Sequence, residues 1–310
     1  MESLSKILAV IDPDDPEQKA LSRAIELAEK VDASVTAILV TFDFSYELTT
    51  MLSNDEREAM RETMLSSSSD WLELLINEER FTTDTAVEMQ VHWHNRPYEC
   101  LIQQAIFGKF DLIVKGTTQH DVLKSVIFTP TDWHLLRKAP MSVLLVKDHD
   151  WPEQGNILAA INVGADDEEH RTLNHSITQT ALDMSVILKA NTQFVNAYPA
   201  APVNIAIEIP EFDPQGYNNS VKDFHINAMA KHAEMYAING EHCHIEAGLP
   251  EDVIPNIAKA IDAELVVIGT VGRVGISAAL IGNTAEHVID MLNCDILAIK
   301  PKGFTSPITP

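Results

Sequence analysis

The chain has 310 residues, of which 45% are hydrophobic and 22% are charged, a composition typical of globular proteins. Its 46 acidic and 22 basic side chains give a formal net charge of −24. Nucleic acids and anionic membranes are bound by Lys and Arg, so this acidity argues against both as partners. The length predicts about two domains.

Nothing in the sequence indicates secretion or membrane insertion. The apolar run near the start, residues 7–11, is too short for a signal peptide, and no apolar run approaches the length of a membrane span. The cysteines Cys100, Cys243 and Cys294 are far apart and form no CxxC pair, which favours reduced thiols. We therefore expect a cytoplasmic protein.

The first half of the chain alternates short apolar runs with helical patterns. Ser53 and Glu56 form a capping box, Asp15 before Pro16 reads as a helix start, and Pro97 opens a third helix. The runs that read as strands are residues 7–11, 35–40, 87–93, 112–114 and 143–146. This alternation predicts an α/β fold with a doubly wound parallel sheet.

The second half repeats the same order. Asp166 or Asp167 can cap its first helix, and Pro250 opens a helix that contains Pro255. Its predicted strands are residues 157–161, 194–197, 245–248, 266–268 and 296–299. The chain therefore predicts five strands in each half.

One constant spacing relates the two halves. Gly116 corresponds to Gly269 (269 − 116 = 153), and the pairs Pro97 and Pro250, and Lys147 and Lys300, have the same separation. A single spacing over this length indicates an internal duplication. The predicted organisation is a first domain over residues 1–148, a linker over 149–155, a second domain over 156–302 and a loose tail over 303–310.

The stretch 269–284, GTVGRVGISAALIGNT, joins a predicted strand to a predicted helix. Gly269 and Gly272 let backbone N–H groups approach an anion, and Asn283 with Glu286 resembles a capping box. A helix amino terminus attracts phosphate. The spacing is neither the dinucleotide fingerprint nor the P-loop, so it leaves open a phosphate site of unspecified kind or a glycine-rich turn.

The first-half copy of this stretch has lost these features. Gly272 corresponds to Gln119 and Gly282 to Thr129, while Pro130 stands where the second half has Asn283. Asp132 replaces Ala285 and would place its own carboxylate in the first helical turn, where a phosphate would compete with it. We expect a closed, self-capped copy that binds no nucleotide by this loop.

These residues resemble the universal stress protein family. The stretch 269–284 is similar to its motif of Gly, two residues, Gly, nine residues, Gly and then Ser or Thr. The first strand, ending at Asp12, resembles the acidic end of the family's first strand. The likeness covers both halves, and four stretches, DFSYELTT, WHNRPYE, VIFTPTDWHLLRK and NIAIEIPEFDP, resemble one tandem branch of the family.

The resemblance implies a Rossmann-like or flavodoxin-like sheet with the strand order 3-2-1-4-5 in each half. It implies a cytoplasmic protein in which the two halves pair internally through their fifth strands, and it allows a homodimer. In nucleotide-binding members ATP lies over the end of the first strand, with its phosphates on the glycine loop. Carried over, Asn162 lies near the nucleoside, and the phosphates are lined by Gly269, Gly272, Gly282, Asn283 and Thr284.

Two departures from the family pattern lie in this set. Asn162 replaces the usual acidic residue and Asn283 replaces the usual Ser or Thr, although an amide still forms hydrogen bonds with ribose or phosphate. Arg273 beside the loop is a candidate phosphate contact or an exposed loop residue.

Two other features have a functional and a structural interpretation. His242 and His244, two positions apart, are a candidate metal pair if both lie on a strand, but no third ligand is visible. The apolar stretch 198–212 either lines a pocket or covers a sheet edge.

The function predicted from the sequence is that of a non-catalytic stress protein. Its second half binds ATP, a related nucleotide or another small phosphorylated ligand, with slow ATP hydrolysis left open because no general base is evident. The alternatives are a carrier or sensor of an apolar, lipid-like phosphorylated molecule, and a scaffold that binds no ligand.

Overall fold

The computed structural model describes residues 4–45, 53–78, 81, 83–119, 126–147, 150–200, 213–270 and 283–309. Their contacts divide the chain into two compact units. Unit 1 comprises Met1–Asp148 with Thr305–Pro310, and unit 2 comprises His149–Phe304.

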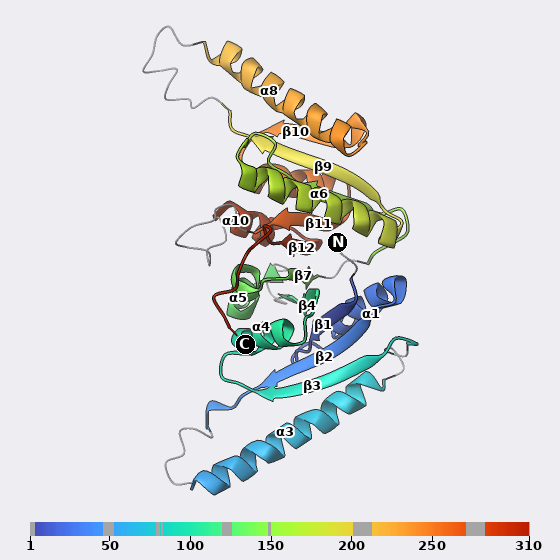
Figure 1. Ribbon diagram of the computed structural model, residues 1–310, viewed down its shortest axis with the longest axis vertical. Coiled ribbons are helices and arrows are strands. Elements are labelled where there is room, and N and C mark those ends of the chain that lie inside the picture. The colour runs from blue at the N-terminus through green and yellow to red at the C-terminus, as the bar shows by residue number, and fades with distance from the viewer. Residues whose placement is uncertain are drawn as a thin grey trace. The chain divides into compact units, whose positions relative to one another are not determined.

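Unit 1 contains a parallel sheet in the order β3-β2-β1-β4-β7 (Figure 1). Its strands are β1 (Lys6–Val10), β2 (Ser34–Thr41), β3 (Val87–Trp93), β4 (Leu112–Gly116) and β7 (Ser142–Val146). The helices that connect them are α1 (Lys19–Val31), α3 (Asn54–Ile76), α4 (Pro97–Phe107) and α5 (Pro130–Lys138). Counted along the chain, this is the predicted order 3-2-1-4-5.

Unit 2 has the same topology, with the strand order β10-β9-β8-β11-β12. Its strands are β8 (Asn156–Ala160), β9 (Asn191–Tyr198), β10 (Cys243–Ala247), β11 (Ala263–Gly269) and β12 (Asp295–Ile299). Its helices are α6 (Glu168–Leu188), α8 (Pro214–Met235), α9 (Pro250–Ala260) and α10 (Asn283–Met291), with a short 3-10 turn, η2 (Gly240–His242).

Each sheet is covered by helices on both faces. Right-handed crossovers place the first two helices of a unit on one face and the last two on the other. The middle strands are therefore continuous apolar runs, and Ile113, Val114 and Val267 have no exposed surface. The long helices α3 and α8 lie beside the edge strands β3 and β10, which stay partly exposed (Figure 1).

The duplication predicted from one spacing is confirmed element by element. The helices α4 and α9 begin at Pro97 and Pro250, and the strands β7 and β12 begin at Ser142 and Asp295. Both pairs of starting positions differ by 153 residues (250 − 97 and 295 − 142). The predicted caps at Ser53 and Asp167 are also present, each accepting a hydrogen bond from the first turn of its helix.

The predicted start of α1 at Asp15 and Pro16 is wrong, because α1 begins at Lys19 after Gln18 in a left-handed conformation. The Gln18 side chain instead forms two hydrogen bonds with the backbone of Asp12. Its Oε1 accepts from Asp12 N at 3.3 Å, and its Nε2 donates to Asp12 O. Tertiary bonding to the end of β1 therefore overrides the local proline signal.

Three smaller features differ from the sequence-based expectation. A two-stranded antiparallel hairpin, β5 (Thr118–Gln119) with β6 (Val126–Ile127), occupies the first-half copy of the glycine stretch. The tail expected to be loose contacts unit 1, where Gln103 Nε2 donates to Thr309 O at 3.1 Å. Finally, Asn283, which the sequence suggests as the residue before this helix, is the first residue of α10.

Candidate functional site

The candidate site of unit 2 is the place where the carboxyl ends of β8 and β11 meet. The two strands are neighbours, and the chain leaves β8 toward β9 but leaves β11 toward β12. Ligands of open parallel sheets bind at such a switch point, outside the carboxyl ends of the strands. Of the predicted site residues, Asn162 follows β8 and Gly269 ends β11.

The backbone of Asn162 is held by a side-chain amide from α6. Asn162 N donates to Asn174 Oδ1 at 3.0 Å, and Asn174 Nδ2 donates to Asn162 O at 2.8 Å. The Asn162 side chain is exposed, and its Oδ1 accepts from Gly164 N at 3.2 Å. Its amide nitrogen has no partner among the described residues, so this N–H₂ group is available to a ligand.

The end of β11 is tied to the end of β12. Thr270 N donates to Ile299 O at 3.2 Å, and Lys300 Nζ donates to Thr270 Oγ1 at 3.0 Å. Lys300 is buried, and burial lowers the pKa of its ammonium group to about 7. A Cβ at Gly269 would lie 2.6 Å from Leu173 Cδ2, so a side chain at this position would require Leu173 to shift.

The rest of the predicted phosphate site is only partly covered by the structure. Gly272, Arg273 and Gly282 lie outside the described residues. Asn283 and Thr284 are the first two residues of α10, so their backbone N–H groups belong to the amino terminus of that helix. Their predicted contacts with phosphate remain predictions.

Sequence reasoning missed a buried cluster beside Asn162. Val163 N donates to Asn196 Oδ1 at 3.1 Å, and Asn196 Nδ2 contacts His225 Nδ1 at 3.0 Å. The imidazole of His225 stacks on Tyr198, with ring centroids 5.0 Å apart and planes inclined by 20°. Burial lowers the pKa of His225, so the ring stays neutral at neutral pH.

The same region of unit 1 is lined by the chain's own carboxylates. Asp15 Oδ2 accepts from Lys19 N at 3.1 Å and would lie 3.4 Å from a Cβ at Gly116, the counterpart of Gly269. Thr129 caps α5, and Asp132 Oδ2 accepts from Thr129 N at 2.7 Å in a capping box. The predicted self-capping of the first-half copy is confirmed.

A buried ion pair accompanies the self-capping of α5 in unit 1. Lys115 Nζ lies 3.2 Å from Asp132 Oδ1, an ion-pair contact without hydrogen-bond geometry, and 3.0 Å from Gly116 O. Both side chains are almost fully buried. In unit 2 the corresponding residues are Ile268 and Ala285, so the pair is specific to unit 1.

The histidine pair considered for metal binding does not lie on one strand. His242 belongs to η2, whereas His244 belongs to β10, and His244 Nε2 contacts Gln193 Oε1 at 2.7 Å. In the described part of the chain, no group of three His, Cys, Asp or Glu side chains is arranged to hold a metal ion.

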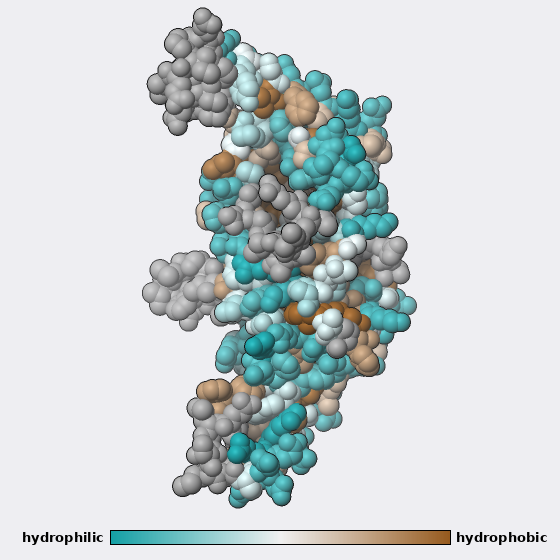
Figure 2. Space-filling model, turned by 60° about the vertical axis from the view of Figure 1, so that its left-hand side comes forward, coloured by the Kyte–Doolittle hydropathy of each residue, from teal (hydrophilic) through white to brown (hydrophobic). Residues whose placement is uncertain are grey.

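The face of the molecule in Figure 2 is mostly hydrophilic, with small separate apolar patches, as expected for a chain with 46 acidic residues. Among the helices that the structure describes, none combines the length and apolar character needed to cross a membrane.

Two doubly wound units with one topology, each with a switch point at the carboxyl ends of its strands, define a class of tandem α/β proteins. The sequence pattern described as the universal stress protein family matches residues 4–147 and 160–300. The chain therefore belongs to the universal stress protein family and has a tandem arrangement of its domain, with the stress-response role of that family.

Relatives over the full length support this assignment. The chain is 45% identical to universal stress protein E from Escherichia coli K12 over 99% of its own length and 98% of that protein. It is 39% identical to a universal stress protein E homolog from Haemophilus influenzae, over 95% and 97% of the two chains. The likeness to one tandem branch, predicted from four stretches, is thereby confirmed.

The fold is also found in solved structures. A crystal structure of a functionally unknown protein from Pseudomonas aeruginosa has a TM-score of 0.75 and 30% identity, covering 98% of this chain and 95% of the other. A universal stress protein from Archaeoglobus fulgidus has a TM-score of 0.63 at 15% identity, with 96% and 97% covered, and supports the fold alone.

Proposed function

We propose that this protein is a non-catalytic stress protein whose unit 2 binds ATP, or another small phosphorylated ligand, at the carboxyl ends of β8 and β11. Backbone N–H groups of the stretch 269–284 and of the first turn of α10 hold the phosphates. The exposed amide of Asn162 donates to the nucleoside part of the ligand.

The observation that carries this proposal is the contrast in capping between α5 of unit 1 and α10 of unit 2. In unit 1 the carboxylate of Asp15 lies near the end of β4, and the carboxylate of Asp132 lies in the first turn of α5. In unit 2 the first turn of α10 has Ala285 in place of Asp132, and Gly282 in place of Thr129. The first turn of α10 contains the carboxylate of Glu286, but Gly282 has no side chain that could cap this helix as Thr129 caps α5, so its terminal N–H groups can attract an external anion.

The position of Lys300 supports the same site. Its ammonium group is buried and reaches Thr270, the residue that follows Gly269. A phosphate bound next to this residue would favour the charged form of the ammonium group. Unit 2 therefore combines a helix amino terminus, an exposed amide and a nearby cation at one end of its sheet.

Titration calorimetry of the full chain with MgATP tests the proposal, together with mass spectrometry of ligands released from the purified protein. We expect one site per chain. Gly282→Asp adds a carboxylate at the α10 terminus and should weaken binding by roughly tenfold or more. The matched variant Thr129→Asp keeps a good capping residue in unit 1 and should leave the affinity unchanged.

Two outcomes contradict the proposal. If no binding heat is measured with MgATP and no phosphate compound is released from the purified protein, the proposed ligand binding is contradicted. Equal losses of affinity in Gly282→Asp and Thr129→Asp would contradict the claim that the ligand binds in unit 2 and not in unit 1. A third variant, Asn162→Ala, separates the parts of the ligand, because it should weaken ATP but leave inorganic triphosphate binding unchanged.

A further inference from the structure

Helix α8 is attached to unit 2 by an unusual set of buried side chains. It has 22 residues and packs on β9 and β10, yet its buried side chains are only His225, Met229, His232 and Ala233. Two of these four are imidazoles, which gain a positive charge in the mildly acidic range when water reaches them. The attachment of α8 therefore contains two groups whose charge can change with pH.

The hydrogen bonds around His225 require a neutral ring. Asn196 of β9 accepts from Val163 N with its Oδ1 at 3.1 Å, which fixes the orientation of the amide and directs its Nδ2 at His225 Nδ1, 3.0 Å away. Because the amide nitrogen can only donate, Nδ1 must accept and cannot carry a proton. Protonation of Nδ1 would bring two donors face to face beside a side chain that has no exposed surface, Asn196.

His232 provides the second contact, two helical turns further along α8. Its Nε2 lies 2.8 Å from Thr178 Oγ1 of α6, and its ring makes an edge contact with Phe194, a fully buried side chain of β9. Neither neighbour carries a charge that could balance an imidazolium ion. A proton on this ring would therefore be an unpaired charge in a largely apolar setting, which is strongly unfavourable.

The titratable groups around His232 do not compensate such a charge. Burial lowers the pKa of His232, and His175 of α6 lowers it further. The phenol of Tyr236, which contacts His175 Nδ1 at 2.6 Å, and the thiol of Cys243, which lies beside Phe194 in the sheet, both have a pKa raised by burial and stay neutral.

The surroundings of His225 also lack a compensating carboxylate. Burial lowers the pKa of His225, and the ring stacks on the neutral phenol of Tyr198. Glu246 of β10 is exposed and acts on Tyr198, and because it alternates with Ile245, the partner of Asn196, it points to the opposite face of the sheet. Along α8, the charged residue three positions before His225 is Lys222, which is a cation.

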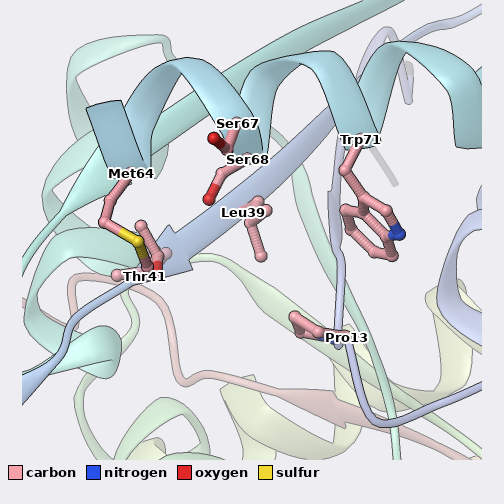
Figure 3. A pocket seen from close by; sticks show the side chains of 8 residues that line it. Pro13, Leu39, Thr41, Met64, Ser67, Ser68 and Trp71 are labelled. Atoms are coloured by element: carbon pink, nitrogen blue, oxygen red, sulfur yellow. The ribbon is translucent and has the colours of Figure 1, made fainter. Parts of the chain in front are cut away.

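Unit 1 attaches the equivalent helix without any imidazole. Helix α3 packs on β2 and β3, and its buried residues are Leu72 and Leu75. The other side chains that it presents to the cavity above β2 are Met64, Ser67, Ser68 and Trp71 (Figure 3). The sequence of α3 contains no histidine, so its attachment has no group that titrates between neutral and mildly acidic pH.

We propose that α8 is an acid-sensitive element of unit 2: protonation of His225 and His232 at mildly acidic pH releases it from β9 and α6 and exposes Met229 and Phe194. In the released helix both rings titrate near their ordinary pKa of about 6.5, whereas burial lowers the pKa of both in the attached helix. The attached state is therefore fully favoured above about pH 6.5 and is weakened as the pH falls below it. Each imidazole raises the equilibrium constant for release by up to about tenfold per pH unit. No residue of the proposed phosphate site takes part, so the release does not depend on ligand binding.

Hydrogen exchange of the full chain, followed by mass spectrometry at about pH 7.5 and about pH 5 and corrected for the intrinsic exchange rate, tests this proposal. We expect the protection of residues 214–235 to fall by at least about tenfold at the lower pH. The protection of residues 54–76 of α3, the internal control, should change little. This comparison needs no variant.

Two substitutions assign the effect to the rings. His225→Gln keeps an acceptor for Asn196, and His232→Leu supplies an apolar side chain such as α3 uses. Each should remove about half of the logarithmic change in protection, and the double variant should remove nearly all of it. His242→Gln, at an exposed histidine of η2, is the matched control and should leave the pH effect intact.

Four results would overturn the proposal. They are unchanged protection of α8 at about pH 5, equal losses of protection in α3 and α8, a loss that persists in the folded double variant, and a loss that His242→Gln abolishes.

Discussion

Lys115 Nζ lies 3.2 Å from Asp132 Oδ1 in the interior of unit 1, where unit 2 has Ile268 and Ala285. Removing one partner leaves the other charge buried, so Lys115→Ile or Asp132→Ala should each lower the free energy of unfolding by about 3–5 kcal/mol. The double variant copies the apolar pair of unit 2, and its free energy of unfolding should fall by less than that of either single variant. Urea denaturation of all four proteins measures this coupling.

The double variant still loses the capping bond from Thr129 N to Asp132, so we expect it to remain about 1 kcal/mol below the parent protein. A loss of stability in the double variant equal to the sum of the two single losses would show that the interaction between Lys115 and Asp132 contributes nothing to the free energy of unfolding.

Lys300 should make stability depend on pH in an unusual direction. Burial lowers its folded-state pKa from 10.5 to about 7, so between these values the unfolded chain binds the extra proton. The free energy of unfolding therefore rises with pH through this window, by an amount on the order of 4 kcal/mol in full. Lys300→Met should remove the rise, most clearly between pH 7 and 9.

The control for Lys300→Met is Lys302→Met, an identical substitution at an exposed position two residues later. Thermal unfolding of the three proteins at several pH values gives the comparison. A rise with pH that survives in Lys300→Met would assign the effect to other groups.

The three thiols should differ in reactivity. Cys100 is buried, and burial raises the pKa of its thiol to about 11, so its reactive thiolate is scarce at neutral pH. Cys243 at the start of β10 is half-buried and more accessible, although burial raises its pKa as well. With an aromatic disulfide reagent, Cys243 should react first in the native protein, and all three should react in urea. Peptide mass spectrometry identifies the site, and modification of Cys100 as fast as Cys243 would contradict the expectation.

The sequence predicted the sheets well because their strands are short, continuous apolar runs. All ten strand positions were found, and the spacing of 153 residues was visible in Pro97, Gly116 and Lys147 with their counterparts. A buried parallel strand needs apolar residues on both faces, so its signal is local and strong. The self-capping of α5 was also predictable, since a capping box is a local pattern.

The features that the sequence did not reveal depend on contacts between distant segments. Gln18 carries no local signal for its bonds to the backbone of Asp12. Likewise, the stack of His225 on Tyr198 joins a helix to a strand that are distant in the sequence. The duplication was the one usable guide, since it allows position-by-position comparison of the two halves.

Gly164 and His225 provide the last prediction. A Cβ at Gly164 would lie 2.3 Å from His225 Cε1, and the ring has no room to move because it stacks on Tyr198 and contacts Asn196. Gly164→Ala should therefore lower the free energy of unfolding by about 1–3 kcal/mol through overpacking. Gly240→Ala, where a Cβ meets nothing within 4 Å, is the matched control and should change stability little. In a His225→Ala background the loss caused by Gly164→Ala should largely disappear, and chemical denaturation of the four variants measures it. An undiminished loss in that background would show that Gly164 is needed for the loop backbone rather than for the ring.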